Sequence, residues 1–267
     1  MAEFLHGLEA EMETPTLYGV FHIAAFLIII AASVLLSVLG KDSKDKTFRR
    51  ICLVFWILYF LFEAYKQTIY SFNYNDGSPY WDYQWYAFPF QLCSSPLYVL
   101  PFVFLSKEGS NVRRAAVGYM ATYVFFAGAA VMAYPGDVFV RTIGINIQTM
   151  FWHGSQVILG SFFLTRHRRE LNRRFFVSAV VGFLIMVGVA MALNMTIPNF
   201  TDETFNMFFI SPKFPSTLPI LSAIWPVVPW PVFFLIYLVG YTLAALIVFF
   251  AAKGIIKISD KKKKMGT

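Results

Sequence analysis

The sequence predicts an all-α polytopic membrane protein with seven transmembrane helices, its N-terminus outside and its C-terminus in the cytoplasm. Its 267 residues are 58% hydrophobic and only 14% charged, with a mean hydropathy of +0.60, whereas about a quarter of an ordinary globular protein is charged. Apolar runs near 20 residues recur, and each can cross a ~30 Å hydrocarbon core as a helix. The basic residues are divided unevenly between the loops, which indicates the orientation.

The spans form one membrane domain, residues 1–267. Their approximate limits are 17–39, 48–71, 86–105, 113–134, 143–165, 174–194 and 230–252. The first is the plainest, because GVFHIAAFLIIIAASVLLSVL is broken by a single histidine. Polar segments set the other limits, in order KDSKDKTFRR, SFNYNDGSPYWDYQW, SKEGSNVRR, AYPGDVFVRT, TRHRRELNRR and the long PNFTDETFNMFFISPKFPSTL.

The orientation follows from charge. Basic residues flank the first, third and fifth loops and follow the last span, whereas Arg141 and Lys213 are the basic residues of the opposite side. By the positive-inside rule the basic loops are cytoplasmic. The same rule accounts for the net charge of +7, so no nucleic-acid partner is expected. The Lys run 261–264 predicts contact with anionic lipids.

Polar residues inside the spans share one depth. At ~1.5 Å per helical residue, Cys93 lies ~10 Å below the outer boundary, His153 ~15 Å, and Glu63 and Lys66 ~8–12 Å. His22 lies at ~8 Å in the same layer. The other candidates in it are Gln91, Ser94, Gln148 and Asn194. Because ionisable groups are costly in the membrane, each indicates a functional site, and together they predict a polar cavity open to the outer leaflet.

A thiol beside an imidazole suits acyl transfer. The thiolate of Cys93 attacks an ester carbonyl and holds the acyl group as a thioester. His153 takes the thiol proton and returns it to the leaving alcohol, while Gln91, Ser94 or backbone amides stabilise the oxyanion. At this depth the expected substrates are membrane phospholipids, both as acyl donor and as acceptor.

Simpler roles compete with these. Glu63 and Lys66 are three residues apart on one helix face and can simply neutralise each other. A cysteine in a membrane helix is usually an inert packing residue, which is our interpretation of Cys52 in RRICLVFW. His153 is followed by Gly154, which thins the helix and lets another group approach the imidazole; its alternative role is a hydrogen-bonded packing residue.

The seven-span layout, QLCSSPLYVLP on the third span and WHG on the fifth resemble the YwaF-like bacterial integral membrane proteins. The animal relatives of that family include a cysteine-dependent acyltransferase that makes polyunsaturated ether phospholipids. The resemblance implies that Cys93 carries the acyl thioester, that His153 assists it, and that Glu63 matches a recurring glutamate of the second span. It also implies a multi-pass protein of the cell membrane, in bacteria the plasma membrane.

Three other functions are weighed against the acyltransferase. A lipid ester hydrolase would use the same dyad with water as the acceptor. A non-enzymatic seven-helix ligand-binding protein or transporter remains open, although the paired broken helices of transporters are not found. An intramembrane metal hydrolase is disfavoured, since His22 and His153 are the only histidines within the spans, too few for a three-histidine site unless Glu63 and Cys93 both ligate. No cofactor and no metal are expected.

Overall fold

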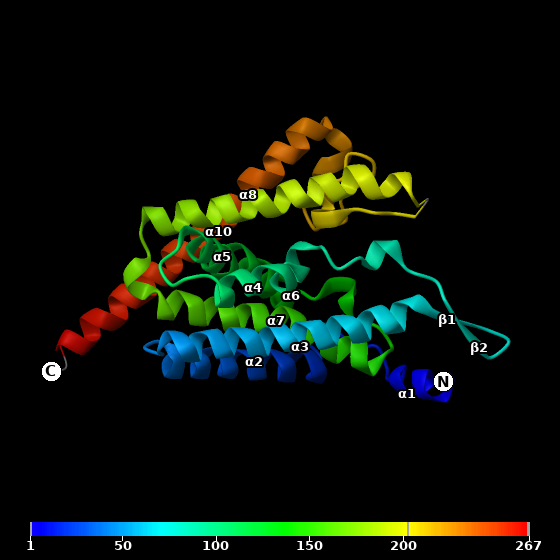
Figure 1. Ribbon diagram of the computed structural model, residues 1–267, viewed down its shortest axis with the longest axis horizontal. Coiled ribbons are helices and arrows are strands. Elements are labelled where there is room, and N and C mark those ends of the chain that lie inside the picture. Colours follow the sequence, from blue (N-terminus) through cyan, green and yellow to red (C-terminus); the bar gives the residue numbers. More distant parts are fainter. Residues whose placement is uncertain (1, 202, 266–267) are drawn as a thin grey trace.

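The computed structural model describes residues 2–201 and 203–265, and these residues form a bundle of helices along one long axis (Figure 1). The helix α1 lies at one end of this axis and the C-terminal end of α10 at the other. The helices are α1 (Ala2–Leu8), α2 (Val20–Gly40), α3 (Asp45–Ser71), α4 (Pro96–Leu105), α5 (Asn111–Tyr119), α6 (Phe125–Ala133), α7 (Ile143–Arg166), α8 (Arg173–Thr196), α9 (Leu221–Ile224) and α10 (Trp230–Met265). An antiparallel hairpin adds β1 (Phe72–Asn75) and β2 (Ser78–Trp81).

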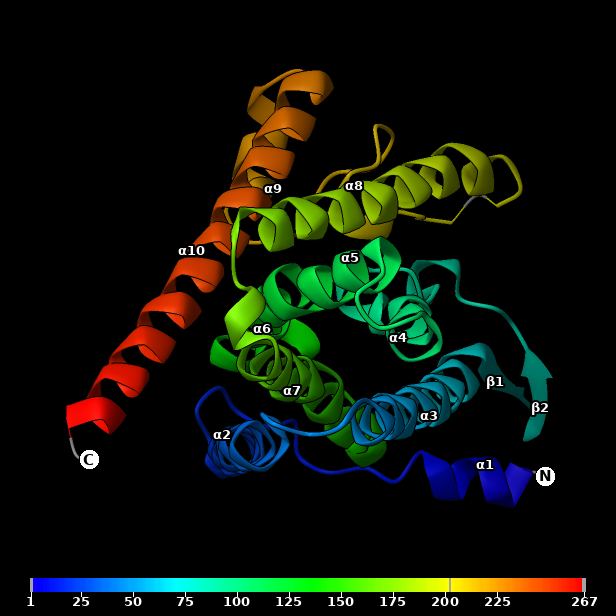
Figure 2. The same cartoon turned by 60° about the vertical axis from the view of Figure 1, so that its left-hand side comes forward.

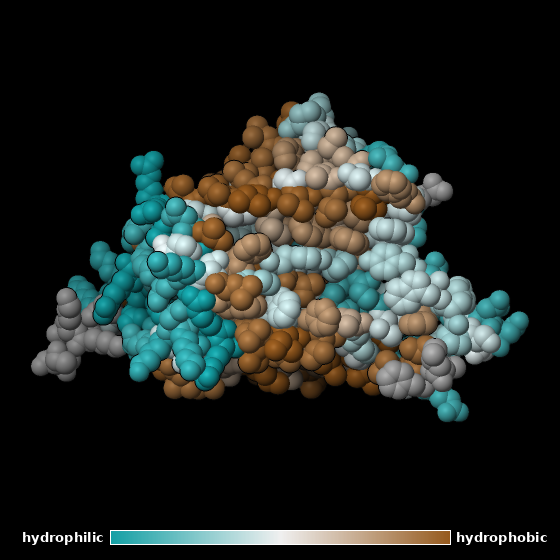
Figure 3. Space-filling model, in the orientation of Figure 1, coloured by the Kyte–Doolittle hydropathy of each residue, from teal (hydrophilic) through white to brown (hydrophobic). Residues whose placement is uncertain are grey.

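The bundle has the surface of a membrane protein. An apolar zone crosses the middle of the face in Figure 3, and polar side chains gather at both ends of the long axis. Among the described residues four helical segments are long and apolar enough to cross a membrane: Val20–Gly40, Asn111–Ala133, Arg173–Asn199 and Trp230–Ser259. The predicted multi-pass helical class is confirmed at this level, while seven crossings and their orientation stay a prediction.

The third predicted span is not one helix, which corrects the expectation for residues 86–105. Two short 3-10 turns, Trp85–Ala87 and Leu92–Ser94, precede α4. Two prolines explain the interruption. Pro89 disfavours helical geometry at the residue before it, and Phe88 is extended (ψ 132°). Pro96 stands at the start of α4, where its missing N–H costs nothing. Cys93 therefore lies at the beginning of a helix, not within one.

Other elements also differ from the sequence prediction. The predicted fourth span is α5 and α6 joined by a π-helical turn, Met120–Val124, and α10 extends well past residue 252. The hairpin within the second polar loop was not predicted. Its turn places both Asp76 and Gly77 at positive φ (48° and 77°), the backbone that a two-residue hairpin turn requires and that Asp-Gly favours.

The helix α7 lies at the centre of the bundle and packs against α2, α3 and α6 (Figure 2). Its buried side chains are unusually polar for a helix at the centre of a membrane protein; they include Asn146, Gln148, Thr149, His153, Ser155 and Gln156. Buried polar groups are costly unless they find hydrogen-bond partners. The elements around α7 therefore have to supply partners for these side chains. The candidate site lies where some of these polar side chains meet the neighbouring elements.

Small residues bring the helices close together. A Cβ at Gly118 of α5 would lie 3.0 Å from the Cβ of Ala179 on α8, and one at Gly182 would lie 3.0 Å from the carbonyl oxygen of Ala115. Membrane helices associate through such small-residue contacts because the hydrophobic effect does not drive them together. At Gly154 the group that enters is Ile29 of α2, whose Cδ1 would lie 2.3 Å from an added Cβ.

A charged network lies at the end of the bundle that carries the basic loops. Asp45, in the first turn of α3, accepts hydrogen bonds from Arg113 and Arg49, and Arg49 also donates to the carbonyl oxygens of Phe104 and Ser106 at the end of α4. The hydrogen bond from Arg113, opposed in part by burial, lowers the pKa of the Asp45 carboxyl below its usual value. The network joins α3, α4 and α5 at this end.

A buried loop, residues 205–211, closes the opposite part of the bundle. Phe208 and Phe209 both adopt positive φ (57°), a strained backbone for a side chain of this size. Asn194 of α8 holds the loop: its Oδ1 accepts from the N–H of Met207 at 2.7 Å, and its Nδ2 donates to the Met207 carbonyl oxygen at 2.9 Å. One side chain thus satisfies both backbone polar groups of the buried residue Met207.

Replacing Asn194 by alanine is expected to lower the free energy of unfolding by roughly 2–4 kcal/mol, since it leaves a buried N–H and a buried carbonyl without partners. Thermal unfolding of the purified protein in detergent measures this. Asn199→Ala is the matched control, because that amide is exposed and bonds only to Met195 O; its effect should stay within ~0.5 kcal/mol. Equal effects of the two substitutions would contradict this account of the loop.

Candidate functional site

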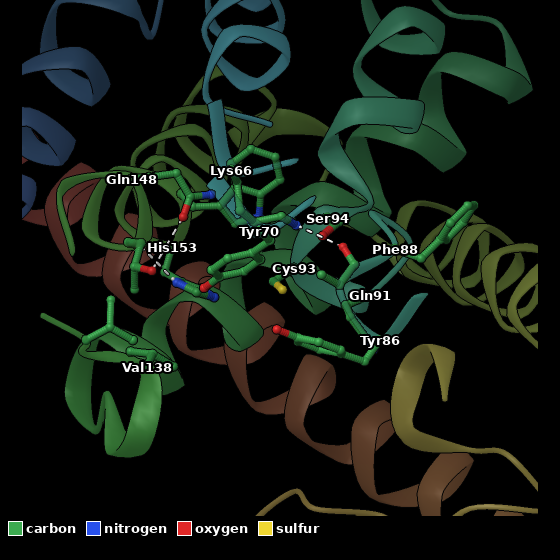
Figure 4. Close-up of a pocket in the computed structure, with 14 residues that line it drawn as sticks. Lys66, Tyr70, Tyr86, Phe88, Gln91, Cys93, Ser94, Val138, Gln148 and His153 are labelled. Carbon is green, nitrogen blue, oxygen red and sulfur yellow. Dashed lines mark hydrogen bonds between the residues drawn. The ribbon is translucent and has the colours of Figure 1, made fainter. Parts of the chain in front are cut away.

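One cavity of about 270 Å³ lies between the C-terminal part of α3, the N-terminal half of α7, the segment before α4 and the loop before α7 (Figure 4). Its lining is partly aromatic and partly polar, and consists of Lys66, Tyr70, Tyr86, Ala87, Phe88, Gln91, Cys93, Ser94, Val138, Val140, Gln148, Thr149, Trp152 and His153. Six of the nine residues singled out in the sequence are in this lining: Lys66, Gln91, Cys93, Ser94, Gln148 and His153. Their roles in chemistry stay predictions.

Cys93 lies in the first turn of the helical segment Leu92–Leu105. The N–H groups of Leu92 and Cys93 have no hydrogen-bond partner among the described residues, whereas that of Ser94 bonds to Gln91 O at 2.9 Å. Free N–H groups and the positive end of the helix dipole favour negative charge there. A helix N-terminus is a setting that stabilises a cysteine thiolate, and the same N–H groups are able to bind an oxyanion.

Four hydrogen bonds hold the turn that carries Cys93 in place. Ser95 Oγ donates to Leu92 O at 2.6 Å, and the hydroxyl of Tyr119 donates to Ser95 Oγ at 2.9 Å. Gln156 Nε2 donates to Cys93 O at 2.8 Å. The backbone N–H of Ser94 closes the turn on Gln91 O. The carbonyl side of the turn is thus occupied, and its N–H side is free.

Gln91 is tied to the buried loop. Its Oε1 accepts from the N–H of Phe208 at 2.7 Å, and its Nε2 donates to Asn206 O at 2.9 Å. The carbonyl and one N–H of this amide are therefore engaged in holding the loop against the turn. Ser94, the next residue after Cys93, also lines the cavity. The free N–H groups and Ser94 are better oxyanion donors than Gln91.

His153 presents one nitrogen to the cavity. Its Nδ1 lies 2.9 Å from the carbonyl oxygen of Thr149, which only accepts, so the proton is on Nδ1. Nε2 is then the basic nitrogen, and it has no hydrogen-bond partner within the described residues. A backbone bond that fixes the tautomer and orients the ring is what a general base requires.

Figure 4 shows the Cys93 sulfur and the His153 ring facing the same space between Tyr70 and Tyr86. No hydrogen bond joins Sγ of Cys93 to Nε2 of His153 in the part of the chain that the structure describes. In enzymes without substrate, catalytic hydrogen bonds are often long and tighten when substrate binds. The arrangement is that of two reactive groups on opposite walls of one cavity.

The ion pair of Glu63 and Lys66 forms, with Nζ 2.8 Å from Oε1. Lys66 Nζ also donates to Ala87 O at 3.2 Å, and Gln67 Nε2 bonds to both Glu63 Oε1 and Ala87 O. Lys66 is part of the cavity lining, whereas Glu63 is not. The pair thus has both features, since the two residues neutralise each other and the ammonium also faces the cavity.

Two candidates from the sequence lie elsewhere. His22 of α2 is 1% exposed; its Nε2 donates to Met132 O at 2.8 Å, and its Nδ1 accepts from the N–H of Tyr18 at 3.1 Å. Both ring nitrogens are occupied. The amide of Asn194 is committed to Met207. Shared depth placed these residues in one layer with Cys93, but they face other parts of the bundle.

The sequence reasoning missed several residues of the site. Tyr70, Tyr86 and Trp152 supply most of the aromatic wall, and Gln156 holds the backbone of Cys93. Gln156 follows His153 by three positions, the spacing that puts two side chains on one helix face, so the signal was in the WHGSQ segment. No group of three His, Cys, Asp or Glu suited to a metal ion occurs among the described residues.

The comparison with known families decides the relationship of the chain. The TMEM164 family model matches residues 17–253, a region that includes the cavity and all nine candidate residues. The chain belongs to the TMEM164 family. This is the family of the animal ether-lipid acyltransferase, so the predicted animal relationship is confirmed at the level of family. The nearer likeness to YwaF-like bacterial proteins stays a prediction.

No curated protein and no solved structure matches the chain. Family membership is consistent with a lipid-related membrane enzyme, and it supports a multi-pass membrane protein. The reaction that the site could support depends on the thiol, the imidazole and their surroundings.

Proposed function

We propose that this protein is a membrane phospholipid acyltransferase, or transacylase, that carries the acyl group as a thioester on Cys93. The observation that carries the proposal is a single cavity with a cysteine at a helix N-terminus and a histidine whose Nε2 is unbonded. Cysteine attack on an ester requires a thiolate and a proton acceptor. The turn before α4 carries the thiol, and α7 carries the unbonded imidazole nitrogen that we propose as the acceptor.

In the first half-reaction the Sγ–H proton of Cys93 passes to Nε2 of His153, and the sulfur bonds to the ester carbonyl carbon of the donor lipid. The negative oxygen is held by the free N–H groups of Leu92 and Cys93, with Ser94 Oγ beside them. When the intermediate collapses, the ester C–O bond breaks and His153 returns the proton to the leaving alkoxide. The products are acyl-Cys93 and a lysolipid.

In the second half-reaction the hydroxyl of the acceptor lipid gives its proton to Nε2 of His153, and its oxygen attacks the thioester carbon. The C–S bond breaks, and the thiolate of Cys93 regains the proton from His153. Lys66 is paired with Glu63, but its ammonium is the member of the pair that lines the cavity, where it favours both the thiolate and the oxyanion. Water in place of the lipid acceptor gives hydrolysis by the same steps.

The cavity supports lipids as substrates. At about 270 Å³ it falls below the ~300–1,000 Å³ of pockets that enclose whole drug-sized ligands, so it accommodates an ester group and its neighbours and leaves the chains outside. Counting from Ile143 at ~1.5 Å per residue, His153 lies ~15 Å along α7. That depth suits a cavity reached by lipid esters from the membrane.

The topology proposed with this function has seven crossings, with N-terminus outside and C-terminus in the cytoplasm. They are α2, α3, the broken segment 86–105, α5 with α6, α7, α8 and α10. By the positive-inside rule, the basic loops and the Lys run 261–264 are on the cytoplasmic side of the membrane. We propose that the Lys run contacts anionic lipid there. The helix α1 and the C-terminal part of α10 lie at opposite ends of the bundle (Figure 1), which is consistent with an odd number of crossings. The cell membrane, in bacteria the plasma membrane, is the proposed location.

The test is to incubate the purified protein with phospholipid and a lysolipid acceptor and to record its intact mass. We expect a mass increase of one acyl group, located on Cys93 by peptide mapping and removed by neutral hydroxylamine, as a thioester is. Transfer of the acyl group from Cys93 to the lysolipid distinguishes a transferase from a hydrolase, which releases free fatty acid. A tightly bound soluble ligand without any acyl adduct would instead favour the ligand-binding alternative.

A further inference from the structure

Gln156 ties α7 to the turn that carries the cysteine. The side chain is fully buried, and its Nε2 donates to the backbone carbonyl oxygen of Cys93 at 2.8 Å. Its Oε1 is buried with no hydrogen-bond partner among the described atoms. The amide therefore makes a single side-chain hydrogen bond, and that bond goes to the cysteine.

We infer that Gln156 is a positioning residue that sets the orientation of the Cys93 thiol relative to His153. The inference rests on the proposed function, because it assigns a role within the same site. His153 and Gln156 are three residues apart on one helix, where neighbouring Cβ atoms lie ~5–6 Å apart. The proposed base, His153, and Gln156 thus belong to one rigid helix. Gln156 holds Cys93 through the backbone carbonyl of that cysteine.

The packing around Gln156 leaves it little freedom. A Cβ at Gly128 of α6 would lie 2.6 Å from Gln156 Cβ and 2.6 Å from the carbonyl oxygen of His153. The backbone of α6 therefore presses directly on the stretch of α7 that holds both residues. The carbonyl groups of Leu92 and Cys93 are held on one side of the turn, so their free N–H groups and the thiol are kept toward the cavity.

The role of Gln156 is tested by the reactivity of the thiol, which needs no turnover. In a Cys52→Ala background, the rate of Cys93 alkylation by iodoacetamide is measured by intact mass between pH 6 and 9, with and without His153→Ala. Removing the base should slow alkylation near neutral pH by about tenfold or more, because the thiol loses the acceptor of its proton. In Gln156→Met, which keeps the length but lacks the donor, we expect a slow rate that His153→Ala changes less than about twofold.

Two further variants keep the test decisive. By coupling we mean the dependence of the Cys93 alkylation rate on His153. Gln156→Asn retains an amide but is one methylene shorter, and it should lose this coupling as Gln156→Met does. Ser155→Ala removes a buried hydrogen bond from the adjacent residue of α7, to the hydroxyl of Tyr59 at 2.6 Å, and should leave the coupling intact. Thermal unfolding identifies any variant that is not folded.

The inference is overturned if folded Gln156→Met and Gln156→Asn keep the rate and pH profile of the parent, or if Ser155→Ala loses the coupling equally. Its failure and the failure of the acyltransferase proposal give different results. Coupling that depends on Gln156, in a protein that forms no acyl adduct, would refute the proposed function and leave the positioning role in place.

Discussion

Cys93→Ala is expected to abolish both the acyl adduct and acyl transfer, with a loss of turnover on the order of 10⁴-fold or more, the scale on which removal of a nucleophile acts at other acyl-transfer sites. The physical reason is that, among the described residues lining the cavity, Cys93 is the one cysteine. Ser94 is next in the chain and lines the same wall, but a hydroxyl is a weak nucleophile unless a base activates it. Release of lysolipid and acylation of the acceptor, followed by mass spectrometry, measure the loss.

Cys52→Ala is the matched control, because Cys52 is the other free cysteine and is fully buried in α3. It should lower stability by the ~1 kcal/mol typical of point substitutions, and keep the activity of the folded fraction. Cys93→Ser keeps the shape and is expected to give at most a slow oxygen-ester adduct that resists neutral hydroxylamine. Full activity in Cys93→Ala would remove the acyl-thioester mechanism.

The sequence predicted the shared depth of the candidate residues, and the structure shows which of them share a cavity. Rise per residue places Cys93, Lys66 and His153 in one layer, but depth alone carries no information about direction around a helix axis. His22 has the same depth, yet its two nitrogens are taken by Met132 O and the N–H of Tyr18. Those partners are fixed by the contact of α2 with distant backbone, which no local pattern reveals.

The break before α4 was predictable, since Pro89 and Pro96 bracket the Gln-Leu-Cys-Ser-Ser stretch and each interrupts a helix in a known way. Reading residues 86–105 as one helix overlooked the setting that matters most to the cysteine, a helix N-terminus with free N–H groups. Gln156 was visible by its spacing from His153, but its partner is a backbone carbonyl of another element. Carbonyl groups are common to every residue and leave no trace in a sequence.

His153→Ala is expected to reduce acyl transfer by ~10²–10⁴-fold, the usual contribution of a general acid–base residue. The loss arises in both half-reactions, because the same Nε2 removes the proton from the thiol and then from the acceptor hydroxyl. Adduct formation and adduct consumption should therefore both slow, which stopped-flow mixing with mass detection can separate. A residue that only packed against the cavity would not act on both steps.

Addition of imidazole gives the sharper form of this test. His153→Ala enlarges the cavity of about 270 Å³ by the volume of the missing ring, so free imidazole has room to enter and accept the proton. We expect the rate to rise in proportion to the concentration of neutral imidazole, and so to increase with pH through the imidazole pKa near 6.5–7. His22→Ala provides the contrast, since it removes two buried hydrogen bonds: it should lower the unfolding temperature, keep the activity of the folded protein, and gain nothing from imidazole. If imidazole restored the activity of His22→Ala and not that of His153→Ala, the base would be His22 on α2. The proposed site would then be wrong.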